Sequence, residues 1–334
     1  MVMKKFINDP NNLTAELLEG YTMCYKDKVK LVSDKIVVRA NPKDESKVAV
    51  VTLGGAGHEP ALSGYVGDGM LDASVVGDIF AAPAAPKVLE MLKMFNREAG
   101  ILFVILNHEG DVRNGGMALQ MAEKEGIKVK MLLTHEDIAP GTEAPIEDRR
   151  GLGGCVPLYK IAGAAADAGK SLDEVYEIAE RFNKNTATLA VTMKPATHPQ
   201  TGQYISTLPD DEMEIGMGQH GEGGGTGPQK IASADETAQA MIDKLIAAVD
   251  AKSGDKVMLI INGSGATTLM EMFVVFRKAA KVLESKGIEV VVSRCEEILT
   301  VQEAAGFQMF LAKMDDEMIE LCKAPSNAPY WVTG

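Results

Sequence analysis

The sequence is poor in cysteine and aromatic residues, and each shortage excludes a class of protein. Only 4 of the 334 residues are cysteine, and they are scattered along the chain without paired spacing. This pattern excludes a secreted disulfide scaffold and a zinc site built on cysteine pairs, so we expect buried free thiols. Aromatic residues make up 5% of the chain, so the core must be mainly aliphatic, with 19 methionines to fill gaps.

The chain also lacks excess positive charge and long apolar runs. Its formal net charge is −13, whereas contacts to phosphates need clustered Lys and Arg, so we expect no nucleic-acid partner. No apolar run approaches the ~20 residues of a membrane helix. No apolar core of a signal peptide follows the N-terminal residues, so we expect a cytoplasmic protein that does not associate with membranes.

Length and periodicity predict an α/β fold with two domains, at residues 1–185 and 186–334. Strand-like apolar runs alternate with helical stretches, which is typical of mainly parallel sheets. The expected strands are 48–53, 101–106, 127–133, 187–193, 257–261, 288–292 and 307–313. The expected helices are 86–95, 117–125, 157–168, one that starts at a capping box on Ser171, 234–251 and 269–285. A long loop is expected over 134–154.

The first unusual loop follows strand 48–53 and reads Gly54-Gly-Ala-Gly-His-Glu-Pro60. Glycines let a ligand approach the backbone closely. A dinucleotide fingerprint needs a helix at once, which Pro60 prevents, and the Lys-Ser/Thr of a Walker loop is absent. The loop either binds a small oxygen-rich molecule with His58 as proton acceptor, or it is a tight turn with an incidental histidine.

A carboxylate stands after the strand at 101–106, in the turn that contains Asp111. Ligands of open α/β sheets bind at the carboxyl ends of strands, where this turn and His58 would both lie. Asp111 either orients a substrate hydroxyl or a histidine, or it caps the following helix. His108 and Glu109 beside it line the pocket or face solvent.

The second unusual loop surrounds His220, with six glycines among residues 216–225. A purely structural element gains nothing from so much glycine. A neutral imidazole in such a loop can add to a carbonyl group, and cradling of a phosphate by backbone amides is the alternative. No metal site is expected, because no further His, Cys or paired carboxylate stands at ligand spacing. His135 and His198 lie in polar loops and are interpreted as non-catalytic.

Short segments in a fixed order match one family along essentially the whole chain. They are residues 7–10, 54–60, 64–70, 77–80, 110–111, 149–151, Asn183, 213–216, 220–222, 265–267 and 315–317. In these segments the sequence resembles the stand-alone substrate-binding subunit of phosphotransferase-system-dependent dihydroxyacetone kinases. The resemblance implies a homodimer of two-domain α/β subunits with the substrate site in the cleft between the domains.

The resemblance also implies a role for each site residue. His220 would form a covalent hemiaminal with the carbonyl of dihydroxyacetone or a related small ketose. Gly55, Ala56, Gly57 and His58 would hold the substrate, with His58 as general base, and Asp111 would hydrogen-bond the hydroxyl that is phosphorylated. The family implies a separate nucleotide-binding subunit, which carries ADP or ATP and takes phosphate from phosphoenolpyruvate through a phosphocarrier. No cofactor is expected on this chain.

Two positions depart from the family pattern. Leu106 replaces a lysine that touches substrate, and Ala56 replaces a common serine. The loss of a charged donor alters binding by a few kcal/mol, which opens the site to other ketoses such as a tetrulose. It also leaves a second function open, that of a non-catalytic ketose-sensing coregulator that binds a transcription factor. His58 and Asp111 favour the kinase, since a sensor needs only His220 and a shaped pocket.

Overall fold

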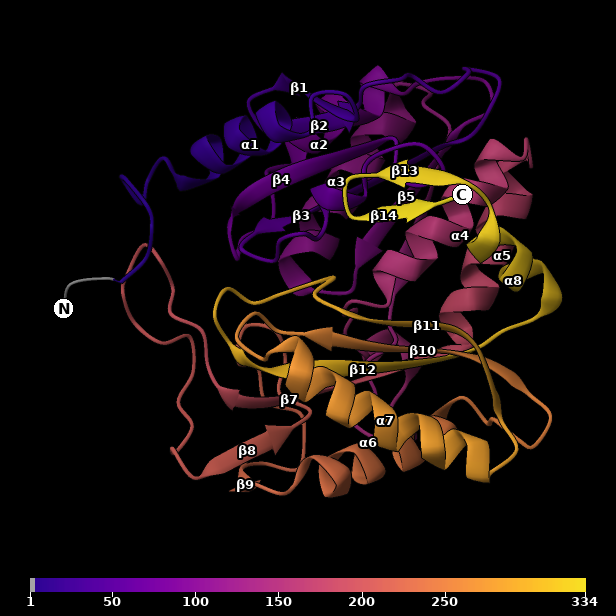
Figure 1. Cartoon of the computed structure of the whole chain (residues 1–334). Coiled ribbons are helices and arrows are strands. Elements are labelled where there is room, and N and C mark those ends of the chain that lie inside the picture. The colour runs from indigo at the N-terminus through magenta and orange to yellow at the C-terminus, as the bar shows by residue number, and fades with distance from the viewer. Residues whose placement is uncertain (1–3) are drawn as a thin grey trace.

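The first sheet of the computed structural model, which describes residues 4–334, has six strands in the order β1-β2-β4-β3-β5-β6 (Figure 1). The pairs β4–β3, β3–β5 and β5–β6 are parallel, and β2 is antiparallel to β1 and β4. The strands are Val29–Ser33 (β1), Ile36–Arg39 (β2), Ala49–Ala56 (β3), Ala73–Ile79 (β4), Ile101–Leu106 (β5) and Val129–Thr134 (β6).

The second sheet also has six strands, in the order β11-β10-β12-β7-β8-β9. The strands are Thr186–Lys194 (β7), Glu212–Ile215 (β8), Gln229–Lys230 (β9), Lys256–Gly263 (β10), Glu289–Glu296 (β11) and Ala305–Lys313 (β12). Only β10 and β11, which are joined through a helix, pair in parallel. β12 is antiparallel to β10 and β7, since the connection over residues 297–304 is too short for a parallel crossover.

The α/β class is therefore confirmed, and parallel pairing is confirmed for the centre of the first sheet. The second sheet differs from the expectation of mainly parallel strands, because the pairs β7–β8 and β8–β9 are antiparallel as well. Apolar runs such as β12 are compatible with either direction when both faces of a sheet are buried, so the pattern alone did not reveal the antiparallel pairs.

Helices cover both sheets and fill the space between them (Figure 1). α2 and α3 pack on one face of the first sheet, and α4 and α5 pack on the other. α6 and α7 cover the outer face of the second sheet. The helices are Leu13–Cys24 (α1), Ala85–Met94 (α2), Glu109–Lys124 (α3), Cys155–Asp167 (α4), Leu172–Lys184 (α5), Ala234–Ala248 (α6), Leu269–Ser285 (α7) and Asp316–Lys323 (α8).

The layer between the sheets holds one continuous apolar core to which both halves of the chain contribute. α4 is buried along almost its whole length. Along β10, Val257 and Ile261 face the outer core with α6 and α7, while Met258 and Ile260 face the shared core with α4. Both faces of the second sheet are thus buried, which explains its unbroken apolar runs.

The C-terminal segment returns to the first half of the chain. The Asn327 N–H donates to Asp68 O at 2.8 Å, and the Tyr330 N–H donates to Gly64 O at 3.1 Å. These contacts place the hairpin of Ser326–Ala328 (β13) and Trp331–Thr333 (β14) beside the first sheet. The division after residue 185 coincides with the start of the second sheet at Thr186, and the assignment of the two parts as domains stays a prediction.

Most predicted elements are present. The strand at 101–106 and the helix at 269–285 have the observed bounds of β5 and α7, and the capping box on Ser171 is formed with Glu174. The helix predicted over 117–125 was too short, since α3 begins at Glu109. Residues 109–116 contain one apolar side chain, Val112, among polar residues and glycines, so no apolar period marks this first part of α3.

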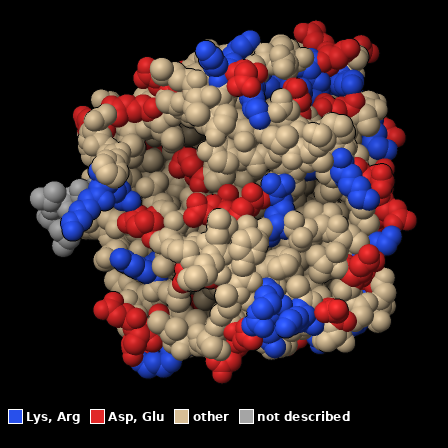
Figure 2. Space-filling view, viewed as in Figure 1, with Lys and Arg blue, Asp and Glu red and all other residues tan. Residues whose placement is uncertain are grey.

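Charged side chains are interspersed on the surface in view in Figure 2, where Lys and Arg stand among Asp and Glu without forming a continuous basic band. The absence of a nucleic-acid partner, expected from the net charge of −13, stays a prediction. No helix within residues 4–334 is long and apolar enough to span a membrane.

Candidate functional site

The turn after β3 brings His58 to the carboxyl edge of the first sheet. A Cβ at Gly55 would lie 2.8 Å from the Ala81 N atom, and Gly57 has a φ of +101°. Any other residue would clash at Gly55 or be strained at Gly57. The glycines therefore let the strand pass close to residue 81 and turn sharply, so that the imidazole of His58 emerges next to them.

His58 is fixed by the second half of the chain. Its Nδ1 lies 2.7 Å from the Thr300 carbonyl oxygen, and its own carbonyl accepts from the Thr300 N–H at 3.1 Å. Burial, together with the nearby His220, lowers the pKa of His58 to about 3. At neutral pH the ring is therefore uncharged, and since a carbonyl oxygen only accepts, the proton sits on Nδ1 and the Nε2 lone pair is free.

Arg150 holds the glycine segment, defined here as residues 216–225. Its guanidinium donates to the carbonyls of Gly216 at 3.0 Å and Glu222 at 3.1 Å, and it is paired with buried Asp137 at 2.8 Å. A Cβ at Gly218 would collide with both Arg150 and the Glu222 carboxylate. The long loop before α4 thus shapes the backbone that carries His220.

His220 lies between the imidazole of His58 and the carboxylate of Glu222. Its Nε2 is 3.0 Å from His58 Nε2, and its Nδ1 is 3.1 Å from Glu222 Oε1. The other oxygen of Glu222 accepts from the His220 N–H at 2.8 Å. Burial alone would raise the pKa of Glu222, but these hydrogen bonds and the charge of His220 lower it well below its usual range. Glu222 is therefore an ionised acceptor that fixes the orientation of the His220 ring.

The carboxyl group of Asp111 lies at the same cavity as His58 and His220, and one of its oxygens has no hydrogen-bond partner in the described part of the chain. Asp111 lies in the first turn of α3, but its side chain caps nothing, and its buried Oδ1 makes no hydrogen bond within residues 4–334. Burial raises the pKa of Asp111 to about 7, against the opposing effect of His220. Because buried polar atoms are nearly always paired, this oxygen is an open position for a ligand hydroxyl.

One small cavity brings most of the predicted residues together. Gly55, His58, Leu106, Asp111 and His220 all line it. Ala56 and Gly57, predicted to hold substrate, stand beside this cavity but do not line it. His135 and His198 are outside it as well, although His198 stacks on the edge of a lining residue, Phe80, with 5.6 Å between ring centroids.

Sequence reasoning missed several lining residues, chiefly Phe80, Gln219 and Leu299, and left His108 undecided. Gln219 is buried, and its Nε2 has no partner within residues 4–334, so it offers a second open polar position. The only signal in the sequence was that Gln219 lies in the glycine segment and Phe80 in a short matched motif. Phe80 approaches His58, with 5.2 Å between ring centroids, because β3 and β4 are paired in the first sheet.

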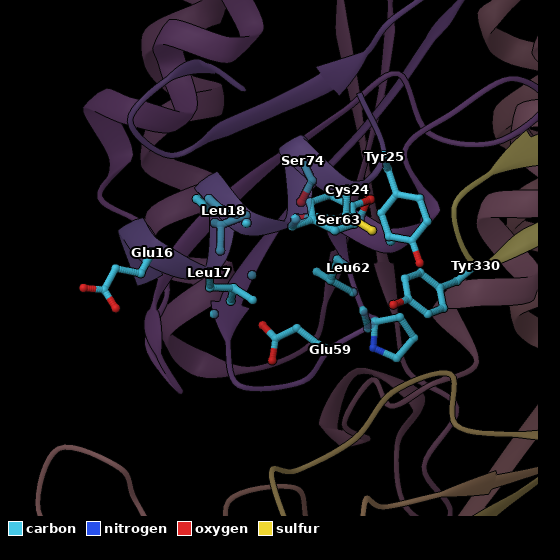
Figure 3. Close-up of a pocket in the computed structure, with 18 residues that line it drawn as sticks. Glu16, Leu17, Leu18, Cys24, Tyr25, Glu59, Leu62, Ser63, Ser74 and Tyr330 are labelled. Atoms are coloured by element: carbon cyan, nitrogen blue, oxygen red, sulfur yellow. The ribbon is translucent and has the colours of Figure 1, made fainter. Parts of the chain in front are cut away.

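A second, much larger cavity of about 430 Å³ is lined by residues of α1 and of the segment 59–64, among others (Figure 3). It shares Gly54, Gly55 and Leu62 with the small cavity, and Tyr25 and Tyr330 stand together at one end. Its walls are mostly apolar, and it contains neither of the two site histidines. Size alone would select this cavity, but the reactive side chains gather in the smaller one.

Comparison with known proteins identifies the family of this chain. Residues 19–330 match the Dak1 domain family. The chain is 36% identical to the dihydroxyacetone-binding subunit DhaK of the PTS-dependent dihydroxyacetone kinase 1 of Listeria innocua, over 98% of this chain and 100% of that protein. It is 33% identical to the L-erythrulose kinase of Pectobacterium atrosepticum, over 99% of this chain and 57% of that protein.

A solved structure described as the dihydroxyacetone kinase operon co-activator DhaQ has the same fold. It superposes with a TM-score of 0.90 at 29% identity, over 96% of this chain and 98% of that one. Motifs, fold and family match agree along the chain, which therefore belongs to the Dak1 domain family, together with the dihydroxyacetone-binding subunits of dihydroxyacetone kinases.

Proposed function

We propose that this chain binds dihydroxyacetone or a related short ketose covalently through His220 and presents a hydroxyl of the ketose for phosphorylation. The observation that carries the proposal is the meeting of His58, His220 and Asp111 at one cavity, with the two Nε2 atoms 3.0 Å apart. A nucleophile, a base and an open hydroxyl acceptor are the groups that this chemistry needs.

The covalent step uses the Nε2 lone pair of His220. When the ring carries its proton on Nδ1, toward Glu222, Nε2 adds to the carbonyl carbon and forms a C–N bond. The π pair of the carbonyl moves to its oxygen, which takes up a proton. The positive charge that arises on the imidazole is compensated by the Glu222 carboxylate, 3.1 Å from Nδ1.

The phosphoryl-transfer step uses His58 and Asp111. The Nε2 of neutral His58 accepts the proton of the attacking hydroxyl, while the open oxygen of Asp111 accepts a hydrogen bond that orients it. The phosphate comes from ATP on a separate nucleotide-binding subunit, where a phosphocarrier regenerates it from bound ADP with phosphoenolpyruvate as the source. No nucleotide binds this chain, which works as a homodimer.

Leu106 adjusts which ketose enters. It lies at the end of β5, is 5% exposed and lines the cavity where the family pattern has a lysine. Without that cation the cavity favours a larger ketose, such as a tetrulose, whose additional carbon and hydroxyl group make further contacts with the cavity wall. The name of the L-erythrulose kinase relative supports a four-carbon ketose. Leu106→Lys should raise the preference for dihydroxyacetone over erythrulose about tenfold in competition assays.

The test mixes the purified chain with ketoses and follows the intact mass after trapping of the adduct. A mass increase of one ketose is expected, absent in His220→Ala and retained in the control His135→Ala, which lies outside the cavity. A nucleotide-loaded partner subunit then converts the bound ketose to its phosphate. An adduct that survives His220→Ala would contradict the covalent assignment.

A second function is favoured by the structural likeness to the DhaQ co-activator and by Leu106. In this function the chain senses a ketose and binds a transcription regulator without catalysis. The two functions differ in one outcome, since a sensor forms the adduct but gives no phosphorylated product with any ketose and any nucleotide-loaded subunit. Formation of product would leave the kinase function as the only one of the two.

A further inference from the structure

We propose that His108, His220 and Glu222 form a binding site for a zinc ion, and that zinc there blocks addition of His220 to a ketone. The inference goes beyond the proposed function, because it adds a way in which the covalent step is regulated. One ligand atom from each of the three residues lies within 4.8 Å of the others. Two histidines and a carboxylate are a frequent ligand set of zinc sites that keep an open position.

The free nitrogen of His108 points to the site. Its Nε2 lies 2.8 Å from the Gly151 carbonyl oxygen, so the ring proton sits on Nε2 and the lone pair on Nδ1. That Nδ1 lies 3.9 Å from Glu222 Oε1, too far for a hydrogen bond. A histidine that donates one nitrogen to a backbone carbonyl and offers the other is the usual arrangement of a metal ligand.

The distances suit a small cation. Zinc binds nitrogen and oxygen at about 2.0 to 2.2 Å, which puts tetrahedral ligand atoms about 3.4 Å apart. The His220 Nδ1 to Glu222 Oε1 distance is 3.1 Å, and the His108 Nδ1 to Glu222 Oε1 distance is 3.9 Å. A zinc ion replaces the Nδ1 proton of His220, and the other oxygen of Glu222 keeps its hydrogen bond to the His220 N–H.

Charge and access also favour a cation here. The Glu222 carboxylate supplies negative charge, and the guanidinium of Arg150, which contacts the Glu222 carbonyl, is already paired with Asp137. The Glu222 side chain is 40% exposed, so an ion can enter from solvent. His108 belongs to the same segment as Leu106, which departs from the family pattern.

Occupation of the site stops the covalent step for a simple reason. With zinc on Nδ1, the single proton of neutral His220 moves to Nε2, and that nitrogen then has no lone pair for a carbonyl carbon. Ketone addition and zinc binding are thus mutually exclusive on one ring. No oxidation or further reactant is involved, since zinc takes the Nδ1 lone pair of the neutral ring and water carries the ring proton from Nδ1 to Nε2.

The site is tested by calorimetric titration of the full chain with zinc chloride, in a Cys24→Ser background that removes the exposed thiol. One zinc per chain is expected, with a dissociation constant in the micromolar range or below. His108→Gln keeps a donor for the Gly151 carbonyl but loses the free nitrogen, and it should weaken binding at least tenfold. His135→Gln, a histidine outside the cluster, is the matched control and should bind as the parent does.

Cobalt(II) gives a spectroscopic test that needs no ketone. The visible absorption of tetrahedral cobalt should appear with the parent chain and with His135→Gln, and be lost with His108→Gln. Equal zinc affinity in the parent and His108→Gln, or no binding at millimolar zinc, would overturn the site.

The blocking effect is measured by trapping the ketone adduct with and without saturating zinc. Zinc should reduce the adduct at least tenfold in the parent and leave it unchanged in His108→Gln. An adduct that persists or increases with zinc bound would overturn the block. If no adduct forms without zinc, the proposed function fails, while calorimetry and cobalt absorption still decide the metal site.

Discussion

The reactive ring nitrogens of His58 and His220 lie against hydrogen-bonding neighbours. The Thr300 carbonyl fixes the proton of His58 on Nδ1, and His220 lies between two acceptors, the lone pair on His58 Nε2 and the Glu222 carboxylate. The functions of these rings therefore depend on acceptors that a sequence motif does not reveal. Glu222 is a positioning residue in this arrangement, because it acts through His220.

Replacing the acceptor should weaken the nucleophile without removing it. Glu222→Gln keeps an oxygen for the His220 N–H but loses the charge that stabilises the imidazolium, so we expect adduct formation to slow about tenfold to hundredfold. The rate is measured by trapping and mass spectrometry. Glu222→Asp should restore part of the rate, and an unchanged rate in Glu222→Gln would contradict the role.

Asp111 should make the protein less stable as the pH rises. Burial raises its pKa to about 7, above the roughly 3.9 of an unfolded chain. Between these values the native state holds a proton that the unfolded chain has released, so stability is lost between about pH 4 and about pH 7. Asp111→Asn should therefore raise the free energy of unfolding at pH 8 by about 1 to 3 kcal/mol, and less toward pH 4.

The matched control for Asp111 is Asp148→Asn, at an exposed aspartate in the same half of the chain. Urea unfolding of both variants and the parent is compared at pH 4, 6 and 8. A gain at pH 8 that equals the gain at pH 4 would contradict the assignment.

At the scale of elements, long apolar runs were predictable and junctions were not. β5 and α7 have unbroken apolar or amphipathic patterns, and their observed bounds equal those predicted. α3 begins eight residues before the predicted helix, and the prediction missed this part because Val112 is the one apolar side chain there and forms no period. The antiparallel pairing in the second sheet depends on the lengths of the connections and on the order of the strands. The periodicity of apolar residues carries no information on either.

The same limit applies to the site. His58, Asp111 and His220 were predicted because each stands in an unusual loop. The meeting of His108 with His220 and Glu222 was not, since it joins positions 108 and 220 through the contact of α3 with the glycine segment. The sequence spacing therefore did not indicate the group of three potential ligands that the fold brings together.

The glycine segment should tolerate a methyl group at one position and not at another. A Cβ at Gly218 collides with Arg150 and Glu222, whereas a Cβ at Gly223 meets nothing within 4 Å. Gly218→Ala should displace His220 and reduce adduct formation at least tenfold, while Gly223→Ala forms the adduct as the parent does. Thermal unfolding of both variants shows that the loss is local, and equal adduct rates in the two would refute this role of Gly218.

At the scale of the whole molecule, the shared core joins the two sheets into one unit. Phe310 from β12 is 1% exposed and lies in the core that also contains α4. Trp331, the only tryptophan, lies against the Arg294 guanidinium at 3.9 Å, on a hairpin whose other strand bonds to Asp68. Its fluorescence therefore reports on both halves of the chain.

We expect unfolding in urea to be a single cooperative transition. Trp331 fluorescence and far-ultraviolet circular dichroism should give the same urea midpoint. Phe310→Ala should lower the free energy of unfolding measured by either signal by about 3 to 5 kcal/mol. Phe273→Ala is the control, since Phe273 is 56% exposed. Two separated transitions would instead favour independent unfolding of residues 1–185 and 186–334.

The contact between His58 and His220 has a kinetic consequence. A carbonyl carbon has to approach His220 Nε2 from the place where His58 Nε2 already lies, at 3.0 Å. The protein's own imidazole thus competes with every ligand, and binding waits for the two rings to part. The observed association rate should therefore level off at high ketone concentration, at the frequency of ring separation, and the apparent affinity is scaled by the fraction of time the rings spend apart.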